Sequence, residues 1–289
     1  MYLIFKLKRA LAGLLVVAAG IAGVLAASYL QSAQNVASKQ REVQIPIIMY
    51  HSLLKDPDLQ GKYVISPEVL ENDMKYLKEK GYTAVNVQDL LDFVDGKKEL
   101  PEKPVILSFD DGYYNNYYYA YPLAKQYNMK IVIAPIGSCT DKFSATTDEH
   151  IPYSHITWDE IKEMMASGLV EFQNHTYDLH TNKQGKVGVK KMAGETDEAY
   201  QKRLAGDVVK MQQRMKENTG YEPSCFVYPF GAKSEKTAEL IKEMGFRCTF
   251  TCESKVNTIS RNPESLYELG RFLRTGKKSS AEFFGEILD

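Results

Sequence analysis

Short apolar runs alternate with longer amphipathic segments from residue 45 onward. Runs rich in Val, Ile and Phe predict strands at residues 45–50, 83–87, 105–109, 130–136, 169–173, 224–228 and 246–251. Helices are expected between most of these strands. Ser66 and Pro67 begin one helix, and Thr157 with Glu160 forms a capping box for another. Such alternation predicts an α/β fold with a mainly parallel sheet, either closed into a barrel or doubly wound.

The amino-terminal region has a different pattern, because residues 10–38 contain no charged side chain. Its central part, residues 11–30, is long enough as a helix to cross about 30 Å of hydrocarbon. The basic residues Lys6, Lys8 and Arg9 precede it, which predicts a cytoplasmic amino terminus with the rest of the chain outside the membrane. A cleavable signal is the alternative, since the small residues 26–28 resemble a processing site.

These patterns divide the chain into four expected segments. A basic cytoplasmic segment covers residues 1–9, a single transmembrane anchor covers residues 10–30, and a polar tether covers residues 31–44. One folded domain is expected to occupy residues 45–289.

Composition narrows the class of protein without identifying it. The 289 residues are 44% hydrophobic and 25% charged, which is the usage of a globular protein. The net charge of −1 points away from a nucleic-acid partner, and no pattern implies a protein partner. Four cysteines permit disulfides, but Cys248 and Cys252 lie four residues apart in an expected strand, about 13 Å, which is beyond bridging distance.

Two adjacent carboxylates, Asp110 and Asp111, end the apolar run at residues 105–109 and are followed by Gly112. Burying neighbouring charges inside a strand costs too much, so we expect both at its carboxyl end, facing a cleft where a metal or a substrate compensates them. The alternative is an ordinary polar turn made from Asp and Gly.

Two histidines, His175 and His180, follow another apolar run at residues 169–173. A spacing of five lets them share a ligand only if the backbone turns between them, and a loop at a strand end supplies that turn. With one Asp oxygen they make a three-ligand set that leaves a position open for water, as in catalytic zinc sites. The alternative is a pair of loop histidines in solvent.

The candidate residues share a position relative to the strands. His51, Asp110, Asp111, His175 and the turn at residues 228–231 each follow the carboxyl end of an expected strand. In an α/β barrel these ends converge on one face. We therefore expect one pocket that contains all of these side chains.

These residues resemble motifs of the polysaccharide deacetylases of carbohydrate esterase family four, the NodB-homology type. Residues 108–112 look like the first motif, and His175, Thr176 and His180 look like the second, within a resemblance that covers roughly residues 45–274. The resemblance implies a distorted (β/α)7 barrel and removal of N-acetyl groups with a divalent metal, zinc first, with cobalt, nickel or manganese as alternatives. It also implies that Asp110 is the general base and that Asp111, His175 and His180 bind the metal.

Two departures from the family pattern affect the remaining roles. Val227 stands where the third motif usually has an arginine, and no histidine follows His180. His51 is similar to the early histidine of exported poly-N-acetylglucosamine deacetylases, whose motifs are permuted, so we expect it to be the general acid with a near-neutral pKa. Arg271 is a candidate for the missing arginine beside Asp110, with Arg274 as the alternative.

Further residues are assigned to the oxyanion and to the substrate. The family's third motif implies that the Phe230 N–H helps to hold the oxyanion. Tyr114, Tyr228 and Trp158 are candidates for contacts with sugar rings, against the alternative of core packing. Tyr113, Tyr117 and Tyr121 share a helical face and are expected to pack against the strands. The Lys- and Gly-rich residues 181–197 predict a loop or lid at the catalytic face, or simply a solvated charge run.

The combined hypothesis is a membrane-tethered, metal-dependent polysaccharide deacetylase on the outer side of the bacterial cell membrane. Its substrate would be peptidoglycan or an exopolysaccharide containing N-acetylglucosamine. One alternative uses the same pocket to cleave O-acetyl esters from a polysaccharide such as xylan. Another alternative is a non-catalytic module that binds a wall glycan.

Overall fold

The computed structural model describes residues 42–146 and 148–288. The expected basic segment, the membrane anchor and most of the tether lie outside these residues. Among the described residues, no helix has the length and apolar character needed to cross a membrane. The expected tether boundary at residue 44 is wrong, because Val43–Ile45 forms strand β1 and pairs with β13 (Asn257–Ile259). The folded unit therefore begins at Val43.

Five parallel strands form the central sheet, in the order β14, β2, β6, β7 and β8. Their bounds are Ile47–Tyr50 for β2, Pro104–Asp111 for β6, Ile131–Pro135 for β7, Val170–Phe172 for β8 and Phe272–Leu273 for β14. A sixth strand, β5 (Thr83–Ala84), pairs with the beginning of β6. β2 and β6 are buried along their whole length, as expected for parallel strands that are covered on both faces.

Two more strands, β11 (Cys225–Val227) and β12 (Cys248–Phe250), are parallel to each other. An isolated β-bridge, made of two backbone hydrogen bonds, joins each of them to a segment next to the central sheet. Asn174, after β8, donates to the carbonyl of Cys225 at 3.2 Å, and its own carbonyl accepts from the Val227 N–H at 2.9 Å. Leu269, before β14, donates to Thr249 at 2.9 Å and accepts from Thr251 at 2.8 Å. Backbone hydrogen bonds therefore connect β8 to β11, and β12 to the residues just before β14.

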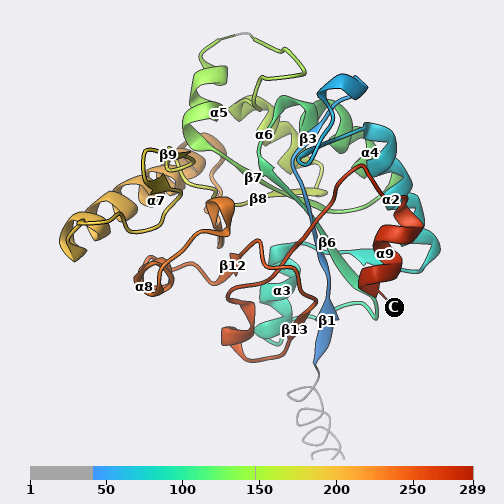
Figure 1. The fold of residues 1–289 in the computed structure, drawn as a ribbon. Coiled ribbons are helices and arrows are strands. Elements are labelled where there is room, and N and C mark those ends of the chain that lie inside the picture. Colours follow the sequence, from blue (N-terminus) through green and yellow to red (C-terminus); the bar gives the residue numbers. More distant parts are fainter. Residues whose placement is uncertain (1–41, 147, 289) are drawn as a thin grey trace, which may run out of the picture. The chain divides into compact units, whose positions relative to one another are not determined.

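Helices surround these strands, as Figure 1 shows. They are α2 (Pro67–Glu79), α3 (Val87–Val94), α4 (Tyr121–Tyr127), α5 (Gly137–Ser144), α6 (Trp158–Ala166), α7 (Asp197–Thr219), α8 (Glu235–Glu243) and α9 (Ser280–Leu288). The expected caps are present: the Ser66 side chain accepts from the Val69 N–H, and Thr157 with Glu160 forms a capping box. The strand expected at residues 83–87 is shorter, because Asn86 and Asp89 form a capping box that begins α3 at Val87.

Short elements complete the fold. The strand pairs are β3 (Ser52–Leu53) with β4 (Val64–Ile65), and β9 (Asn182–Lys183) with β10 (Lys186–Val187). 3-10 turns lie at Pro57–Leu59, Pro229–Gly231 and Pro263–Leu266, and a π-helical turn lies at Asn116–Ala120.

Side chains of β6 alternate between two packed layers. Leu107 and Phe109 pack with α2 and other helices, whereas Ile106 packs with residues of β11 and β12. Because side chains alternate along a strand, Ser108 and Asp110 lie on the same side as Ile106. Strand geometry thus directs Asp110 toward the interior between the strands, at the carboxyl end of β6.

Candidate active site

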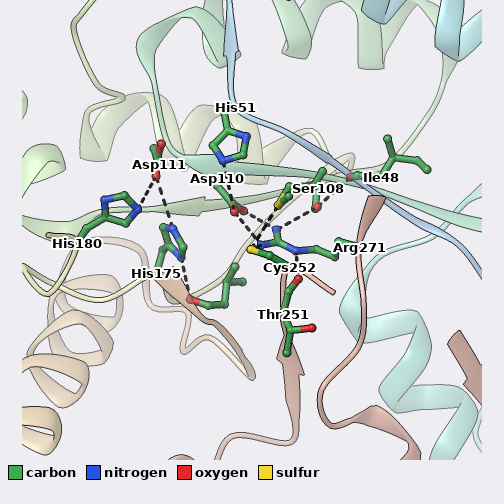
Figure 2. Close-up of polar contacts among 12 residues, drawn as sticks. Ile48, His51, Ser108, Asp110, Asp111, His175, His180, Thr251, Cys252 and Arg271 are labelled. Carbon is green, nitrogen blue, oxygen red and sulfur yellow. Dashed lines mark hydrogen bonds and ion pairs between the residues drawn. The ribbon is translucent and has the colours of Figure 1, made fainter. Parts of the chain in front are cut away.

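Asp110 is held by Arg271, as Figure 2 shows. The guanidinium donates from Nη1 to Oδ1 at 2.6 Å and from Nη2 to Oδ2 at 2.8 Å, and both side chains are buried. Arg271 also donates from Nε to the carbonyl of Thr251 at 2.9 Å. Burial by itself would raise the pKa of Asp110, but the charge and hydrogen bonds of Arg271, together with His175 and His51, outweigh burial and hold the pKa well below its usual range. Asp110 is therefore an ionised carboxylate with a fixed orientation.

Arg274, the alternative to Arg271, lies elsewhere. It pairs with Asp73 of α2 through Nε to Oδ2 at 2.8 Å and Nη2 to Oδ1 at 3.0 Å. Both Arg274 and Asp73 are buried, and Tyr50 donates to the same carboxylate. The structure thus decides between the two arginines: Arg271 lies beside Asp110, and Arg274 belongs to a separate buried pair.

Asp111 turns away from Asp110 because its backbone has a left-handed φ of 70°. The following Gly112 also has a positive φ, and a Cβ there would lie 2.6 Å from Cβ of Pro135, so glycine is required at this turn. The turn directs Oδ1 of Asp111 toward Nε2 of His175 at 3.5 Å and Nε2 of His180 at 3.2 Å. Among the described residues, this buried oxygen has no hydrogen-bond partner.

The two histidines converge because the backbone turns after β8. Thr176, next to His175, has a positive φ of 73°. His175 is buried, and its Nδ1 lies 2.8 Å from the carbonyl of Val227, which leaves Nε2 facing Asp111. Burial, together with the charge of His175, lowers the pKa of His180 to about 4. The expected turn between the histidines is present, and the alternative of two solvated loop histidines is wrong for the buried His175.

Asp111, His175 and His180 fit a divalent metal. Their ligand atoms all lie within 4.8 Å of one another. Two nitrogen or oxygen donors that each lie about 2.1 Å from a tetrahedral ion are separated by about 3.4 Å. The observed separations of 3.5 and 3.2 Å are close to this value. One carboxylate and two imidazoles also leave a position open, as in catalytic zinc sites.

His51 also lies close to Asp110. Its Nε2 is 4.0 Å from Oδ2 of Asp110, and its side chain is 14% exposed. Its Nδ1 is buried and has no hydrogen-bond partner among the described residues. Burial lowers the pKa of His51 more than Asp110 and Asp111 raise it. The pKa of His51 is thus shifted below that of a free imidazole, because desolvation favours the neutral ring.

Phe230 occupies an exposed turn after β11. Its φ of 59° is left-handed, and its ring centroid lies 4.5 Å from that of His180. The turn is closed by hydrogen bonds from the Gly231 N–H to Tyr228 and from the Ala232 N–H to Pro229. The Phe230 turn thus lies beside a candidate metal ligand.

The three residues expected to contact sugar rings are buried. Tyr114 packs against neighbouring tyrosines, and Trp158 donates from Nε1 to Asp141 at 2.8 Å. Tyr228 packs edge-on against Phe226 in the core beneath α7 and α8. These three expectations are wrong, because a sugar requires an exposed ring face and these side chains offer none.

Three further residues, Tyr113, His155 and Asp207, support the site, and no local sequence pattern identifies them. Tyr113 was expected to pack against the strands, but its ring stacks on His155 at 4.8 Å, and His155 Nδ1 lies 3.0 Å from the carbonyl of Asp111. Burial and the nearby Asp111 charge raise the pKa of Tyr113.

Asp207 of α7 accepts from the N–H groups of Tyr177 and Asp178, both at 2.8 Å. Asp207 thereby fixes the loop between His175 and His180.

The Lys- and Gly-rich residues 181–197 form a hairpin through β9 and β10, followed by a loop. A Cβ on Gly188 would lie 2.9 Å from the carbonyl of Pro229, so this segment packs on the Phe230 turn. Its lysines at 183, 186 and 190 are exposed. The segment therefore lies at the catalytic face, as expected.

Comparison with known proteins agrees with this geometry. A family model described as polysaccharide deacetylase matches residues 97–249, more than half of the chain. The poly-beta-1,6-N-acetyl-D-glucosamine N-deacetylase of Escherichia coli is 29% identical over 259 residues, which cover 83% of this chain and 38% of that protein. The chain thus matches less than two fifths of the length of this relative.

Two solved structures are also similar. A de-N-acetylase from Aggregatibacter actinomycetemcomitans is 29% identical with a TM-score of 0.70, covering 82% of this chain and 97% of that chain. IcaB from Ammonifex degensii is 28% identical with a TM-score of 0.65, covering 81% and 92%. On the combined evidence of motif residues, fold and family match, the chain belongs to the polysaccharide deacetylase family of enzymes.

Proposed function

We propose that this protein is a metal-dependent hydrolase that removes N-acetyl groups from a polymer of N-acetylglucosamine. One observation carries the proposal: the convergence of Asp111, His175 and His180 beside an ionised Asp110 that Arg271 orients. The relatives named above are deacetylases, and the Escherichia coli protein acts on poly-beta-1,6-N-acetyl-D-glucosamine. The substrate of this chain is proposed by similarity to that protein.

Asp111, His175 and His180 would hold the metal, with zinc as the first candidate and cobalt, nickel or manganese as alternatives. When bound there, a metal would supply Lewis acidity for activating water and polarising the acetyl carbonyl. The Nδ1 contact between His175 and Val227 sets the ring orientation that such a ligand needs.

Asp110 is the proposed acceptor of the proton of the attacking water. Each carboxylate oxygen accepts one hydrogen bond from Arg271 and retains a second lone pair for the water. The Arg271 charge keeps the group ionised, so the base is available across the neutral pH range.

His51 is the proposed carrier of the proton to the leaving amine. Because its pKa is lowered, the imidazole is neutral before the reaction and must first receive a proton. Its Nε2 lies 4.0 Å from Oδ2 of Asp110, the group that takes the proton from water. His51 thus acts as the acid after this transfer, and the Phe230 N–H helps to hold the oxyanion.

Two structural features belong to the same proposal. The backbone links among β2, β6, β7, β8, β11, β12 and β14 support a distorted seven-stranded barrel. Residues 10–30 would anchor this domain on the outer side of the bacterial membrane, on the basis of their uncharged sequence. Fractionation of cells that express the full chain, with protease added outside, tests the anchor and its orientation.

The activity is tested with the purified full chain and three substrates: oligosaccharides of N-acetylglucosamine, peptidoglycan and O-acetylated xylan. N-deacetylation releases one acetate for each new amine, whereas ester cleavage releases acetate alone. We expect acetate and amine in equal amounts, abolished by a chelator and restored by zinc or cobalt. Acetate without amine would identify an esterase, and binding without any turnover would identify a glycan-binding module.

Matched variants separate the metal from the base. Asp111→Ala is expected to lose both bound metal and activity, because it removes one of three ligands. Asp110→Asn is expected to retain the metal and lose activity, because it removes only the base. Loss of metal from Asp110→Asn would show that the roles of the two aspartates are exchanged.

A further inference from the structure

Two exposed aromatic rings border the candidate site, one against each outer histidine. Tyr63 is 49% exposed, and its ring centroid lies 4.9 Å from that of His51. Phe230 is 44% exposed and lies 4.5 Å from His180. Each ring therefore has part of its surface against the site and part in solvent.

Other exposed tyrosines do not share this position. The ring contacts of Tyr118, also 49% exposed, are with Tyr114 and Tyr119, and Tyr153 stacks on His150. Neither contact involves a metal-ligand candidate, Asp110 or His51. The location of Tyr63 and Phe230 thus distinguishes them from the general tyrosine content of the chain.

The two rings adjoin different histidines of the site. His51 is 4.0 Å from Asp110, and His180 is 3.2 Å from Asp111, the next residue of β6. Figure 2 shows His51 and His180 on different sides of Asp111. Tyr63 beside His51 and Phe230 beside His180 therefore flank the position where an acetyl group would react.

The surface continues beyond Phe230 into a shallow pocket of about 280 Å³. It is lined by Phe230, Gly231, Lys233, Thr251, Cys252 and Glu253. Cys252 Sγ lies 3.9 Å from Nη2 of Arg271, so the pocket adjoins the residue that orients Asp110. Its volume lies just below the range of about 300–1,000 Å³ for small-ligand sites, so it suits one sugar unit rather than a longer segment.

The backbone at or next to each ring is held by contacts with other segments. The carbonyl of Tyr63 accepts from the Ser52 N–H at 3.1 Å, beside the β3 and β4 pair. At Gly231, next to Phe230, a Cβ would lie 2.9 Å from Cβ of Cys252, so this turn packs closely on the residue after β12. A backbone that is already ordered reduces the conformational freedom that is lost when a ligand binds.

We propose that Tyr63 and the Phe230 pocket bind the sugar units on either side of the unit being deacetylated. The inference rests on the proposed function and adds which residues contact the neighbouring sugar units of the polymer. Pyranose rings present faces of C–H groups, and an exposed aromatic ring fixed on one side packs against such a face. Tyr63 and Phe230 thus take the sugar-contacting role that the buried Tyr114 and Trp158 cannot have.

The test compares Tyr63→Ala and Phe230→Leu with Tyr118→Ala, which removes an equally exposed ring away from the site. Steady-state kinetics on the disaccharide and pentasaccharide of N-acetylglucosamine give kcat and KM separately. We expect KM for the pentasaccharide to rise roughly three- to tenfold in the first two variants, with a smaller change for the disaccharide. Tyr118→Ala is expected to match the wild type.

Binding is measured independently of turnover by calorimetric titration of the pentasaccharide into Asp110→Asn, alone and combined with Tyr63→Ala. Weaker binding in the double variant supports the inference, even if the wild type has no deacetylase activity and the proposed function fails. If the wild type is active but both Tyr63→Ala and Phe230→Leu keep wild-type KM and affinity, the inference is overturned while the proposed function stands.

Discussion

Arg271 and Asp110 lie 161 residues apart in the sequence and form a buried bidentate pair at the carboxyl end of β6. Arg271 lies in the segment just before β14, whereas Asp110 belongs to β6. In the strand order, β2 stands between β14 and β6. We propose that this pair supplies the contact for which the resemblance expects an arginine in the third motif. An equivalent charge would then reach the proposed base, Asp110, from a different part of the chain.

Arg271→Lys is expected to lower kcat by one to two orders of magnitude. A lysine keeps the positive charge but presents a single ammonium, so it cannot hold both oxygens of Asp110 in the planar arrangement. The orientation of the base is then lost while metal binding remains. Acetate release and metal content measured on the same preparation check this expectation.

Arg274→Lys is the matched control, because Arg274 and Asp73 form a comparable buried pair away from the site. We expect a similar loss of stability, on the order of a few kcal/mol, with kcat unchanged for the folded protein. Equal losses of kcat in the two variants would mean that the effect of Arg271 is general destabilisation.

His51→Ala is expected to impair amide hydrolysis more than hydrolysis of an aryl acetate. An amine leaving group needs a proton, whereas an aryl oxide leaves without one. We expect kcat on the N-acetylated oligosaccharide to fall by about 100-fold or more, and the rate on the aryl acetate to fall much less. Equal losses on both substrates would remove His51 from proton donation.

Asp207→Asn is expected to weaken metal binding by about tenfold or more, although residue 207 is not a ligand. Its two oxygens accept from the Tyr177 and Asp178 N–H groups, whereas an asparagine offers one oxygen and places an amide donor against the second N–H. The loop that positions His180 should then relax. Competition with a chelating dye measures the affinity.

Glu217→Gln, an exposed change on the same helix, serves as the control for Asp207→Asn. The cobalt-loaded proteins add a spectroscopic measurement, because displacement of one histidine alters the visible absorption of the ion. An unchanged spectrum and affinity in Asp207→Asn would show that α7 does not position the ligands.

Glu171→Gln is expected to change how stability depends on pH. Burial raises the pKa of Glu171 from its usual 4.5 to about 7, so the folded state retains a proton that the unfolded state loses between these values. The free energy of unfolding of the wild type should therefore fall by up to about 3 kcal/mol, because of this group, as the pH rises from 4.5 to 7. The glutamine variant should not show this fall.

The measurement is urea denaturation at pH 5, 6, 7 and 8. The free energy of unfolding of Glu171→Gln, relative to the wild type, should increase with pH over this range. Glu222→Gln, at an exposed position, should give a difference that does not vary with pH. A constant difference for Glu171→Gln as well would contradict the raised pKa.

Several site residues could be found from sequence because each carries a local signal. An apolar run that ends in Asp110 and Asp111 identifies a strand end, and two histidines after another run identify a second. The structure brings Asp111, His175 and His180 together at the expected edge. Strand periodicity and the convergence of parallel strand ends are general rules, so they hold without knowledge of the particular packing.

Aromatic side chains could not be assigned in the same way. Tyr114 and Trp158 are buried and Tyr63 is exposed, yet nothing in their local sequence distinguishes these environments. Burial depends on which helices and loops cover a residue, and those contacts come from distant parts of the chain. The same holds for Asp207, whose partners lie about thirty residues earlier.

The sequence by itself determined the alternation of strands and helices, the carboxylates and histidines at strand ends, and the family motifs that these residues form. Only the tertiary structure decided that Arg271 rather than Arg274 meets Asp110, that His51 is desolvated, and that Tyr63 and Phe230 border the site. Local propensity and periodicity depend on a few neighbouring residues, so a short stretch of sequence is enough to predict them. Ion pairs, desolvation and ring exposure depend on groups brought together by folding, and they exist only once the chain has packed.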